Sequence, residues 1–375
     1  MRIGTKMKTW QQSAPKEIVV ILDQCFYCLS ALTFKQFLLW WPRFSRIADA
    51  LVNRLALIIQ ASAYSESPLK LHMKKNPDSG NTAHRIVFVT GKGGVGKSSV
   101  AAATALQFAR QGKSVLLVEL GSRSFYGPFL GLPVTDEPLQ WRNNVQVARW
   151  DVEGSLREYI THYLIFKSAA NMVLNNTVMQ ALIGAAPSLS EIAILGKLTA
   201  PMLNDWYKRD VDVVVVDAYA TGQFMTLLRA PRGFAAIAAN GSLHRQSRAI
   251  TKILSDPAVC EYRLVTLAEE MPVSEACEMY ASIKAETGIQ PTLYCNRMLD
   301  IPALPLAQTP CAASLFLDQM QRIASRQSKS LQRLAETGTH AVHALPMVPV
   351  LQVNALLDRL ADALTLTQAE AACST

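Results

Sequence analysis

Residues 89–100, VTGKGGVGKSSV, combine the residue types that hold the phosphates of a nucleotide. Gly91, Gly96, Lys97 and Ser98 satisfy the spacing G-x-x-x-x-G-K-S/T, in which small residues let backbone N–H groups close around phosphate oxygens. The lysine reaches the β- and γ-phosphates and the hydroxyl binds Mg²⁺, so we expect ATP and Mg²⁺ as cofactors. The residues of this loop that we expect to bind the nucleotide are Gly91, Lys92, Gly93, Gly94, Val95, Gly96, Lys97, Ser98 and Ser99.

A second chemical landmark is the aspartate that ends the apolar run of residues 211–217, VDVVVVD. A carboxylate at the end of a buried strand can hold the hydration shell of Mg²⁺ beside a loop hydroxyl. We therefore expect Ser98 and Asp217 to be the metal ligands, with Asp217 acting through water.

The segments on either side of the glycine-rich loop supply the context that the motif needs. Residues 85–90, RIVFVT, are predicted to form a buried strand because they are β-branched, aromatic and apolar. Residues 98–112 place Ala102, Leu106 and Ala109 on one stripe and stop at Gly112, which predicts a helix. The N-terminus of that helix would add its dipole and its free N–H groups to the anion site.

Further strand-like runs alternate with helical stretches along the chain. They are residues 114–120, 145–152, 211–218, 262–268, 291–297 and 340–348. This alternation predicts an α/β fold with a mostly parallel, doubly wound sheet, whose ligands bind beyond the C-terminal ends of the strands. Helical segments at about 153–207 break the alternation and predict an inserted helical lobe.

The loop also carries a second lysine, Lys92, and GKGGVGKSS resembles the deviant Walker A motif of the ArsA, MinD and ParA group of ATPases. In that group the first lysine reaches across a dimer interface to the nucleotide of the partner. The resemblance therefore implies catalytic roles for Lys92 and Lys97, and a homodimer, or a heterodimer with a related ATPase, that closes on ATP. A cation supplied in trans would couple assembly to the nucleotide state. The alternative is that Lys92 is a solvated loop lysine.

The segment that begins at Asp217, DAYATGQ, resembles the switch II sequence D-A-P-A-T-G-H of ArsA-type ATPases, which favours this branch over MinD and ParA. Residues 186–198 resemble the P-G-x-x-E segment of the family, and residues 344–350 its late L-P-x-x-P loop. Residues 294–297, YCNR, match the segment with the adenine-contacting asparagine, which implies nucleotide contacts from Asn296 and Arg297. The resemblance implies a SIMIBI-like P-loop NTPase, and we place the ATPase domain at residues 85–368.

The chain departs from the family at switch I, where the aspartate that orients the attacking water is replaced by Gly121. Glycine cannot polarise water, so either Glu119 substitutes, a partner subunit supplies the group, or hydrolysis is slow. Tyr219 and Gln223 also replace the Pro and His of switch II. Three interpretations stay open. The chain is an ATP-hydrolysing ArsA-type ATPase that acts on an unidentified client, a weakly hydrolysing nucleotide-gated adaptor, or a MinD/ParA-like ATPase positioned at a membrane.

Residues 1–84 form an N-terminal extension that differs in composition from the rest. They hold 11 Lys/Arg and 5 Asp/Glu, or +6 of the net charge of +8, so the remainder is nearly neutral and does not indicate a nucleic-acid partner. Residues 43–59 have the pattern of an amphipathic helix that lies on a membrane surface. The alternative is that translation begins at Met73 and that the residues before it are not part of the protein.

Two further observations concern the location and the client. The sequence has seven scattered cysteines without a disulfide framework, and its loop needs ATP. Both features indicate a cytoplasmic protein. Peripheral association with a membrane stays open as an alternative. Apolar residues between 172 and 183 have the composition of a groove for a protein client, although such a stripe is more often core. They are Met172, Val173, Leu174, Val178, Met179, Leu182 and Ile183.

Overall fold

The computed structural model describes residues 84–163, 187–203, 210–237, 242–301, 311–336, 342–349 and 352–373. The strands within these ranges are β1 (Arg85–Gly91), β2 (Val115–Leu120), β3 (Leu139–Arg142), β4 (Val145–Trp150), β5 (Val213–Ala220), β6 (Cys260–Leu267), β7 (Thr292–Met298) and β8 (Val342–Pro346). The helices are α4 (Lys97–Arg110), α5 (Tyr126–Leu130), α6 (Val152–Tyr163), α9 (Pro187–Leu203), α10 (Thr221–Ile237), α11 (Ser242–Leu254), α12 (Glu270–Thr287), α13 (Cys311–Glu336) and α14 (Val353–Cys373).

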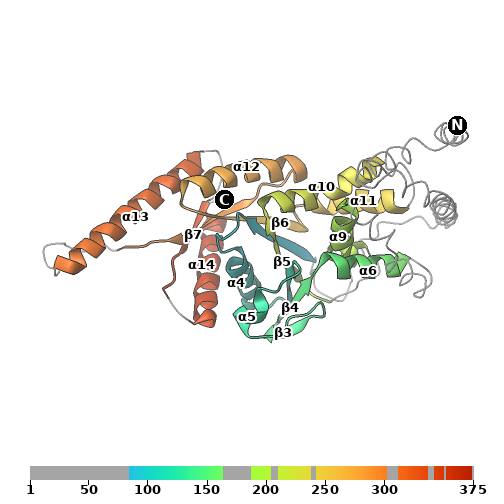
Figure 1. The fold of residues 1–375 in the computed structure, drawn as a ribbon, viewed down its shortest axis with the longest axis horizontal. Helices are drawn as coiled ribbons and strands as arrows, with labels where there is room; N and C mark the ends of the chain where they lie inside the picture. The colour runs from blue at the N-terminus through green and yellow to red at the C-terminus, as the bar shows by residue number, and fades with distance from the viewer. Residues whose placement is uncertain are drawn as a thin grey trace, which may run out of the picture.

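The described strands form one sheet in the order β3-β4-β2-β5-β1-β6-β7-β8. Neighbouring strands run parallel throughout, except for the antiparallel pair β3 and β4. Figure 1 shows α10 and α12 on one side of the sheet and α4 and α14 on the other. The predicted α/β architecture with a mostly parallel, doubly wound sheet is therefore confirmed.

The central strand β1 faces two separate cores because successive side chains of a strand point to opposite faces. Ile86 and Phe88 are fully buried in the core beneath α9, α10, α11 and α12. Val87 and Val89 are fully buried in the core beneath α4 and α14. Burial on both faces explains the continuous apolar run of this strand, which is typical of parallel sheets covered by helices.

The edge strand β3 is the described strand that the sequence pattern does not predict. Its residues, LQWR, are partly exposed and alternate apolar and polar side chains over only four positions, which is the shortest run that can indicate a strand. It pairs with β4 through a short connection that includes Asn144, whose φ of 62° lies in the left-handed region. An antiparallel edge strand on an otherwise parallel sheet needs little burial, so its sequence carries a weak signal.

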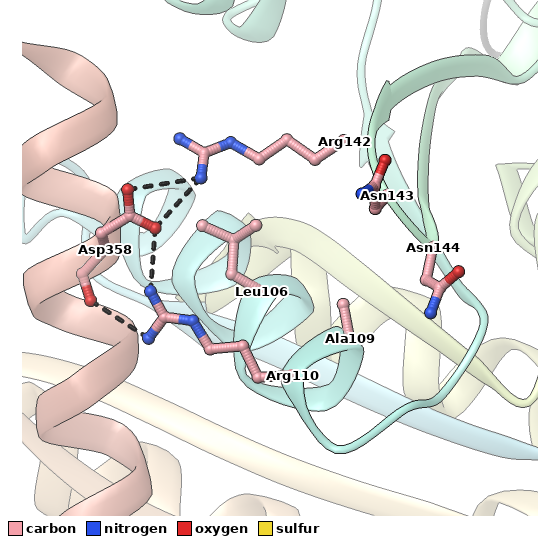
Figure 2. Close-up of a pocket in the computed structure, with 7 residues that line it drawn as sticks. All are labelled: Leu106, Ala109, Arg110, Arg142, Asn143, Asn144 and Asp358. Carbon is pink, nitrogen blue, oxygen red and sulfur yellow. Dashed lines mark hydrogen bonds and ion pairs between the residues drawn. The ribbon is translucent and has the colours of Figure 1, made fainter.

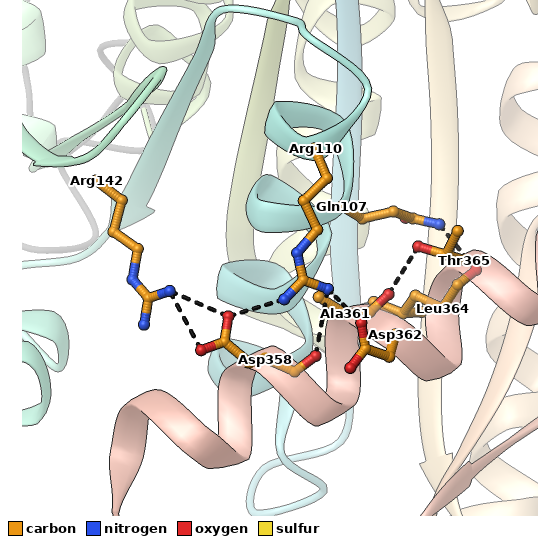
Figure 3. Close-up of polar contacts among 8 residues, drawn as sticks. All are labelled: Gln107, Arg110, Arg142, Asp358, Ala361, Asp362, Leu364 and Thr365. Atoms are coloured by element: carbon orange, nitrogen blue, oxygen red, sulfur yellow. Dashed lines mark hydrogen bonds and ion pairs between the residues drawn. The ribbon is translucent and has the colours of Figure 1, made fainter.

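Helix α14 holds the C-terminal half of α4 through polar contacts (Figure 3). The Gln107 amide nitrogen donates to the carbonyl oxygen of Leu364 at 2.8 Å. The Arg110 guanidinium contacts carboxylate oxygens of Asp358 at 2.8 Å and Asp362 at 2.6 Å. Because α4 begins at the glycine-rich loop, these contacts fix the helix that must position it.

A cavity of about 490 Å³ opens beside these contacts, between α4, the β3–β4 turn and α14 (Figure 2). Two arginines border it, and both Arg110 and Arg142 contact the carboxylate of Asp358. The cavity lies at the C-terminal end of α4, far along the helix from Lys97. It is therefore separate from the glycine-rich loop, and its cationic groups are already paired.

The helices α6 and α9 are the described part of the predicted insertion at about 153–207, and they lie between β4 and β5 in the chain. Lys197 of α9 contacts Glu158 of α6 at 2.7 Å and lies 4.5 Å from the ring centroid of Trp150. These contacts attach the lobe to the end of β4. The apolar residues proposed for a client groove, between 172 and 183, lie outside the described residues.

The N-terminal segment before residue 84, with its predicted amphipathic helix and the alternative start at Met73, also lies outside the described residues. Within the described ranges, no helix combines the length and the apolar character that a membrane crossing requires.

Candidate nucleotide-binding site

The loop between β1 and α4 has a backbone conformation that depends on glycine. Gly91 has a φ of 150°, and a Cβ atom there would lie 2.1 Å from the carbonyl oxygen of Val265 on β6. Gly94 and Gly96 have φ angles of 84° and 94°, which other residues rarely adopt. The loop can therefore fold back on the end of β1 and enter α4 in the way that a phosphate-binding loop requires.

The start of α4 is suited to an anion. Its N-cap is Gly96, which has no side chain to bond the free N–H groups, and the first turn carries no acidic residue. The first N–H groups of a helix have no acceptor within the helix, and the dipole there favours negative charge. Phosphate oxygens would supply the missing acceptors, so the observed helix start fits the nucleotide that the motif predicts.

Lys97 lies at the first position of α4, as the motif predicts. Its ammonium nitrogen donates to the carbonyl oxygen of Lys92, in the same loop, at 3.1 Å. Burial lowers the pKa of Lys97, and the nearby negative charge of Asp217 opposes this shift. The side chain is therefore held over the loop by one backbone acceptor.

Asp217 is buried on β5 and lies beside the start of α4. Burial raises the pKa of Asp217 to about 6. The hydrogen bond from the Ser98 hydroxyl and the charge of Lys97 both lower this pKa, but their effect is smaller than that of burial. The structure thus brings Asp217 together with Lys97 and Ser98, although Asp217 lies 120 positions after Lys97 in the sequence. A hydroxyl and a carboxylate in contact match the two protein oxygens expected for Mg²⁺ in this type of site.

Glu119 lies at the C-terminal end of β2 and is almost fully buried. One carboxylate oxygen accepts a 2.9 Å hydrogen bond from the Ser124 hydroxyl, and the other accepts the backbone N–H of Phe125. The carboxylate therefore caps the turn that leads into α5. Both oxygens of Glu119 therefore accept hydrogen bonds within the chain. Glu119 is the residue that the sequence suggested as a substitute for the switch I aspartate.

Tyr126 is a site residue that sequence reasoning missed. It is fully buried, and its hydroxyl donates to the carbonyl oxygen of Ser98 at 2.8 Å. It also contacts Asp217, and burial together with the charges of Asp217 and Glu119 raises its pKa well above the ordinary value. A lone tyrosine 28 residues after Ser98 has no pattern in the sequence that marks it as part of the site.

Gly121 occupies the switch I position just after β2. Its backbone N–H bonds to the carbonyl oxygen of Trp150 at 3.1 Å, and its φ is 148°. A Cβ atom placed there would have no heavy atom within 4 Å. The position thus has space for a side chain, but its backbone conformation favours glycine.

Asn296 is the last buried residue of β7 and contacts the glycine-rich loop, and the exposed Arg297 follows it. The Asn296 amide nitrogen donates to the carbonyl oxygen of Val95 at 2.9 Å, and its amide oxygen accepts the backbone N–H of Arg297 at 2.9 Å. A Cβ atom at Gly96 would come within 2.4 Å of that amide nitrogen. Asn296 therefore supports the glycine-rich loop directly. The sequence predicted a contact of Asn296 with adenine and did not predict this supporting role.

The two altered switch II residues are placed differently. Tyr219 follows Asp217 on β5, and its carbonyl oxygen accepts a 2.9 Å hydrogen bond from the Thr90 hydroxyl at the end of β1. Burial and the charges of Glu191 and Asp151 raise the pKa of the Tyr219 hydroxyl to about 12. Gln223 lies in the first turn of α10, directly after the strand.

Lys92 is paired within its own chain. Its ammonium nitrogen lies 2.5 Å from a carboxylate oxygen of Glu275 on α12, and both side chains are 34% exposed. This pairing is a second contact that sequence reasoning did not anticipate, because 183 residues separate the two positions.

These features define a P-loop nucleotide-binding protein. The sheet is mostly parallel, and a glycine-rich loop follows its central strand. A lysine and a hydroxyl begin the next helix, and an aspartate lies on a neighbouring strand. Residues 84–239 match the family model of the anion-transporting ATPases, ArsA_ATPase, so this part of the chain is similar to the P-loop domain of the ArsA type. The recognition drawn from the sequence motifs is therefore confirmed.

Relatives with assigned names agree with the family match. The chain is 31% identical over 206 residues to the ATPase BagA of Mycobacterium tuberculosis, covering 52% of this chain and 59% of that protein. It is 29% identical over 226 residues to a putative arsenical pump-driving ATPase of Halobacterium salinarum, covering 55% and 34%. An arsenical pump-driving ATPase of Acidiphilium multivorum is 26% identical over 298 residues, covering 75% and 50%. The matched region thus spans less than two thirds of each of these relatives.

Proposed function

We propose that this chain is a Mg²⁺-dependent ATPase of the ArsA type, in which ATP drives closure of a dimer that acts on a client. The observation that carries the proposal is the meeting of Lys97, Ser98 and Asp217 at the uncapped start of α4. The family match and the names of the relatives support an ATPase.

Each of these groups has a role that follows from its position. The N–H groups of the first turn of α4 would bind phosphate oxygens, and Lys97 would exchange its backbone acceptor for the β- and γ-phosphates. Ser98 and Asp217 would hold Mg²⁺, with Asp217 acting through water, and the ion would neutralise charge on the phosphate oxygens. Tyr126 would keep Asp217 and the backbone of Ser98 in place, because its hydroxyl contacts both.

The dimer is the second part of the proposal, and it rests on Lys92. This lysine lies in the loop but its side chain extends away from the phosphate site to α12. Once released from Glu275, this cation would serve a second nucleotide across an interface, where it would stabilise charge on the transferring phosphoryl group. The partner would be a second copy or a related ATPase.

Light scattering of the full chain with and without Mg·ATP tests the dimer. Wild-type protein should increase in mass with nucleotide, and Lys92→Ala should stay monomeric because the contact of Lys92 exists only in the closed pair. Lys284→Ala is the matched control, since it removes an exposed lysine from α12 and should dimerise like wild type. Nucleotide-dependent dimers of Lys92→Ala would overturn the trans role.

A second candidate, a nucleotide-gated adaptor that hydrolyses ATP slowly, is favoured by one specific observation. Gly121 offers no carboxylate, and both oxygens of Glu119 are bound to the turn before α5. A steady-state turnover measurement separates the two candidates, because an adaptor would bind ATP tightly and release almost no phosphate. In either case the client can be captured on ATP-bound protein and identified by mass spectrometry, with Lys97→Ala as the control.

A further inference from the structure

Lys92 is held at two points within its own subunit. Its side-chain nitrogen pairs with Glu275 at 2.5 Å, and its carbonyl oxygen accepts the Lys97 ammonium at 3.1 Å. The first contact ties the loop to α12, and the second ties it to the start of α4. Both lysines of the loop are therefore committed to contacts inside one subunit.

The topology explains why Glu275 lies beside the loop. Strands β1 and β6 are neighbours, and Gly91 is in register with Val265. Helix α12 begins at Glu270, a few residues after that point, so its second turn lies next to the first residue of the loop. The close approach at Gly91, where a Cβ atom would contact the Val265 carbonyl oxygen at 2.1 Å, fixes this arrangement.

We propose that Glu275 is a latch that holds Lys92 within its own subunit and must release it before Lys92 can reach the nucleotide of a partner. The inference rests on the proposed trans role of Lys92. It adds a residue that neither the loop motif nor the family match identifies, and it gives α12 a part in controlling assembly.

Nucleotide binding is linked to the latch through Lys97. When phosphates draw the Lys97 ammonium into the site, the carbonyl oxygen of Lys92 loses its donor, and one of the two anchors of Lys92 is removed. The Glu275 pair is then the remaining restraint. Because both members of the pair are one-third exposed, it should bias the equilibrium by about two- to fivefold and not block closure.

Amine acetylation followed by mass spectrometry tests the latch directly on the full chain, without nucleotide and at a concentration where it is monomeric. Glu275→Gln should increase the acetylation rate of Lys92 by about twofold or more, because the unpaired amine is open to the reagent. Glu278→Gln is the matched control, since Glu278 is exposed on the same helix. Glu275→Asp keeps the charge but shortens its reach, and should also increase labelling.

The functional consequence is measured by light scattering with Mg·ATP. Glu275→Gln should dimerise at a protein concentration about two- to fivefold lower than wild type, and Glu278→Gln at the wild-type concentration. The double variant Lys92→Ala/Glu275→Gln should stay monomeric like Lys92→Ala. Unchanged labelling and unchanged dimerisation of Glu275→Gln, or weaker dimerisation than wild type, would overturn the latch. Dimerisation of Lys92→Ala would instead overturn the proposed trans role, so the two failures are distinguishable.

Discussion

Glu119 and Asp217 lie directly opposite each other on the neighbouring parallel strands β2 and β5, and both carboxyl groups are buried. Burial raises the pKa of Asp217, and the negative charge of Glu119 adds to that rise. The pair is tolerated because Glu119 is fully hydrogen-bonded by the turn before α5. The charge of Asp217 therefore changes between mildly acidic and neutral pH.

The first prediction concerns the pH dependence of stability. The pKa of Asp217 is raised from 3.8 to about 6, so the unfolded chain releases this proton more readily than the folded one. Ionisation of Asp217 thus costs stability, which falls as the pH rises from about 4 through 6, by about 2–3 kcal/mol in all. Asp217→Asn should be more stable than wild type at pH 7 by about this amount, and the difference should vanish near pH 4.

Urea denaturation at a series of pH values, without Mg²⁺ or nucleotide, measures this difference. Asp136→Asn, which changes an exposed aspartate, should leave the pH profile of wild type unaltered. A stability difference between Asp217→Asn and wild type that stays constant from pH 4 to pH 7 would contradict the assigned shift.

The second prediction is that Lys97→Ala loses ATP binding while the fold is retained. The side chain contacts a loop carbonyl and faces Asp217, and it is not part of either core. Removing a partly buried cation that faces the phosphates should weaken ATP binding by about 30-fold or more. Calorimetric titration measures the affinity, and the unfolding midpoint checks the fold. Wild-type affinity in this variant would refute the assignment of the site.

The third prediction concerns Gly121→Asp, which restores the carboxylate of the family at switch I. Space is available, since a Cβ atom meets no heavy atom within 4 Å, but the φ of 148° strains any other residue. The variant should lose about 1–3 kcal/mol of stability. If the missing carboxylate limits hydrolysis, turnover should rise by about 100-fold, the usual contribution of a well-placed base or water-orienting group. Phosphate release by folded protein, compared with Gly131→Asp at another glycine of positive φ, is the measurement. If wild type is already active and the folded variant hydrolyses ATP no faster, Glu119 or a partner already fills the role and the adaptor interpretation is wrong.

The fourth prediction is that a chain beginning at Met73 is soluble and binds ATP like the full chain. All described members of the site and of the two cores lie after residue 84. Calorimetric titration and light scattering compare the two chains directly, and co-sedimentation with liposomes tests the amphipathic segment at residues 43–59. Aggregation or loss of ATP binding by the shorter chain would place the N-terminal segment within the fold.

The parallel strands and the central loop were predictable from sequence because their signals are local. An apolar run such as that of β1, followed by glycines and a lysine, needs no knowledge of distant residues. Asp217 was predictable because it ends such a run. Tyr126 and Glu275 were not, because each meets its partner through the arrangement of whole elements. The antiparallel β3 was missed because its alternating pattern covers only four partly exposed residues, too short a run to stand out from the neighbouring loops.

The contact between α4 and α14 has a consequence for the order in which the protein can fold during synthesis. Gln107 and its acceptor Leu364 are 257 residues apart, and α14 is the last described helix of the chain. A ribosome must therefore translate nearly the whole sequence before the outer face of the P-loop helix can be covered. Closing a loop over such a separation also costs chain entropy. A nascent chain would therefore expose Leu106 and its apolar neighbours for most of its synthesis. During that period a chaperone could bind them.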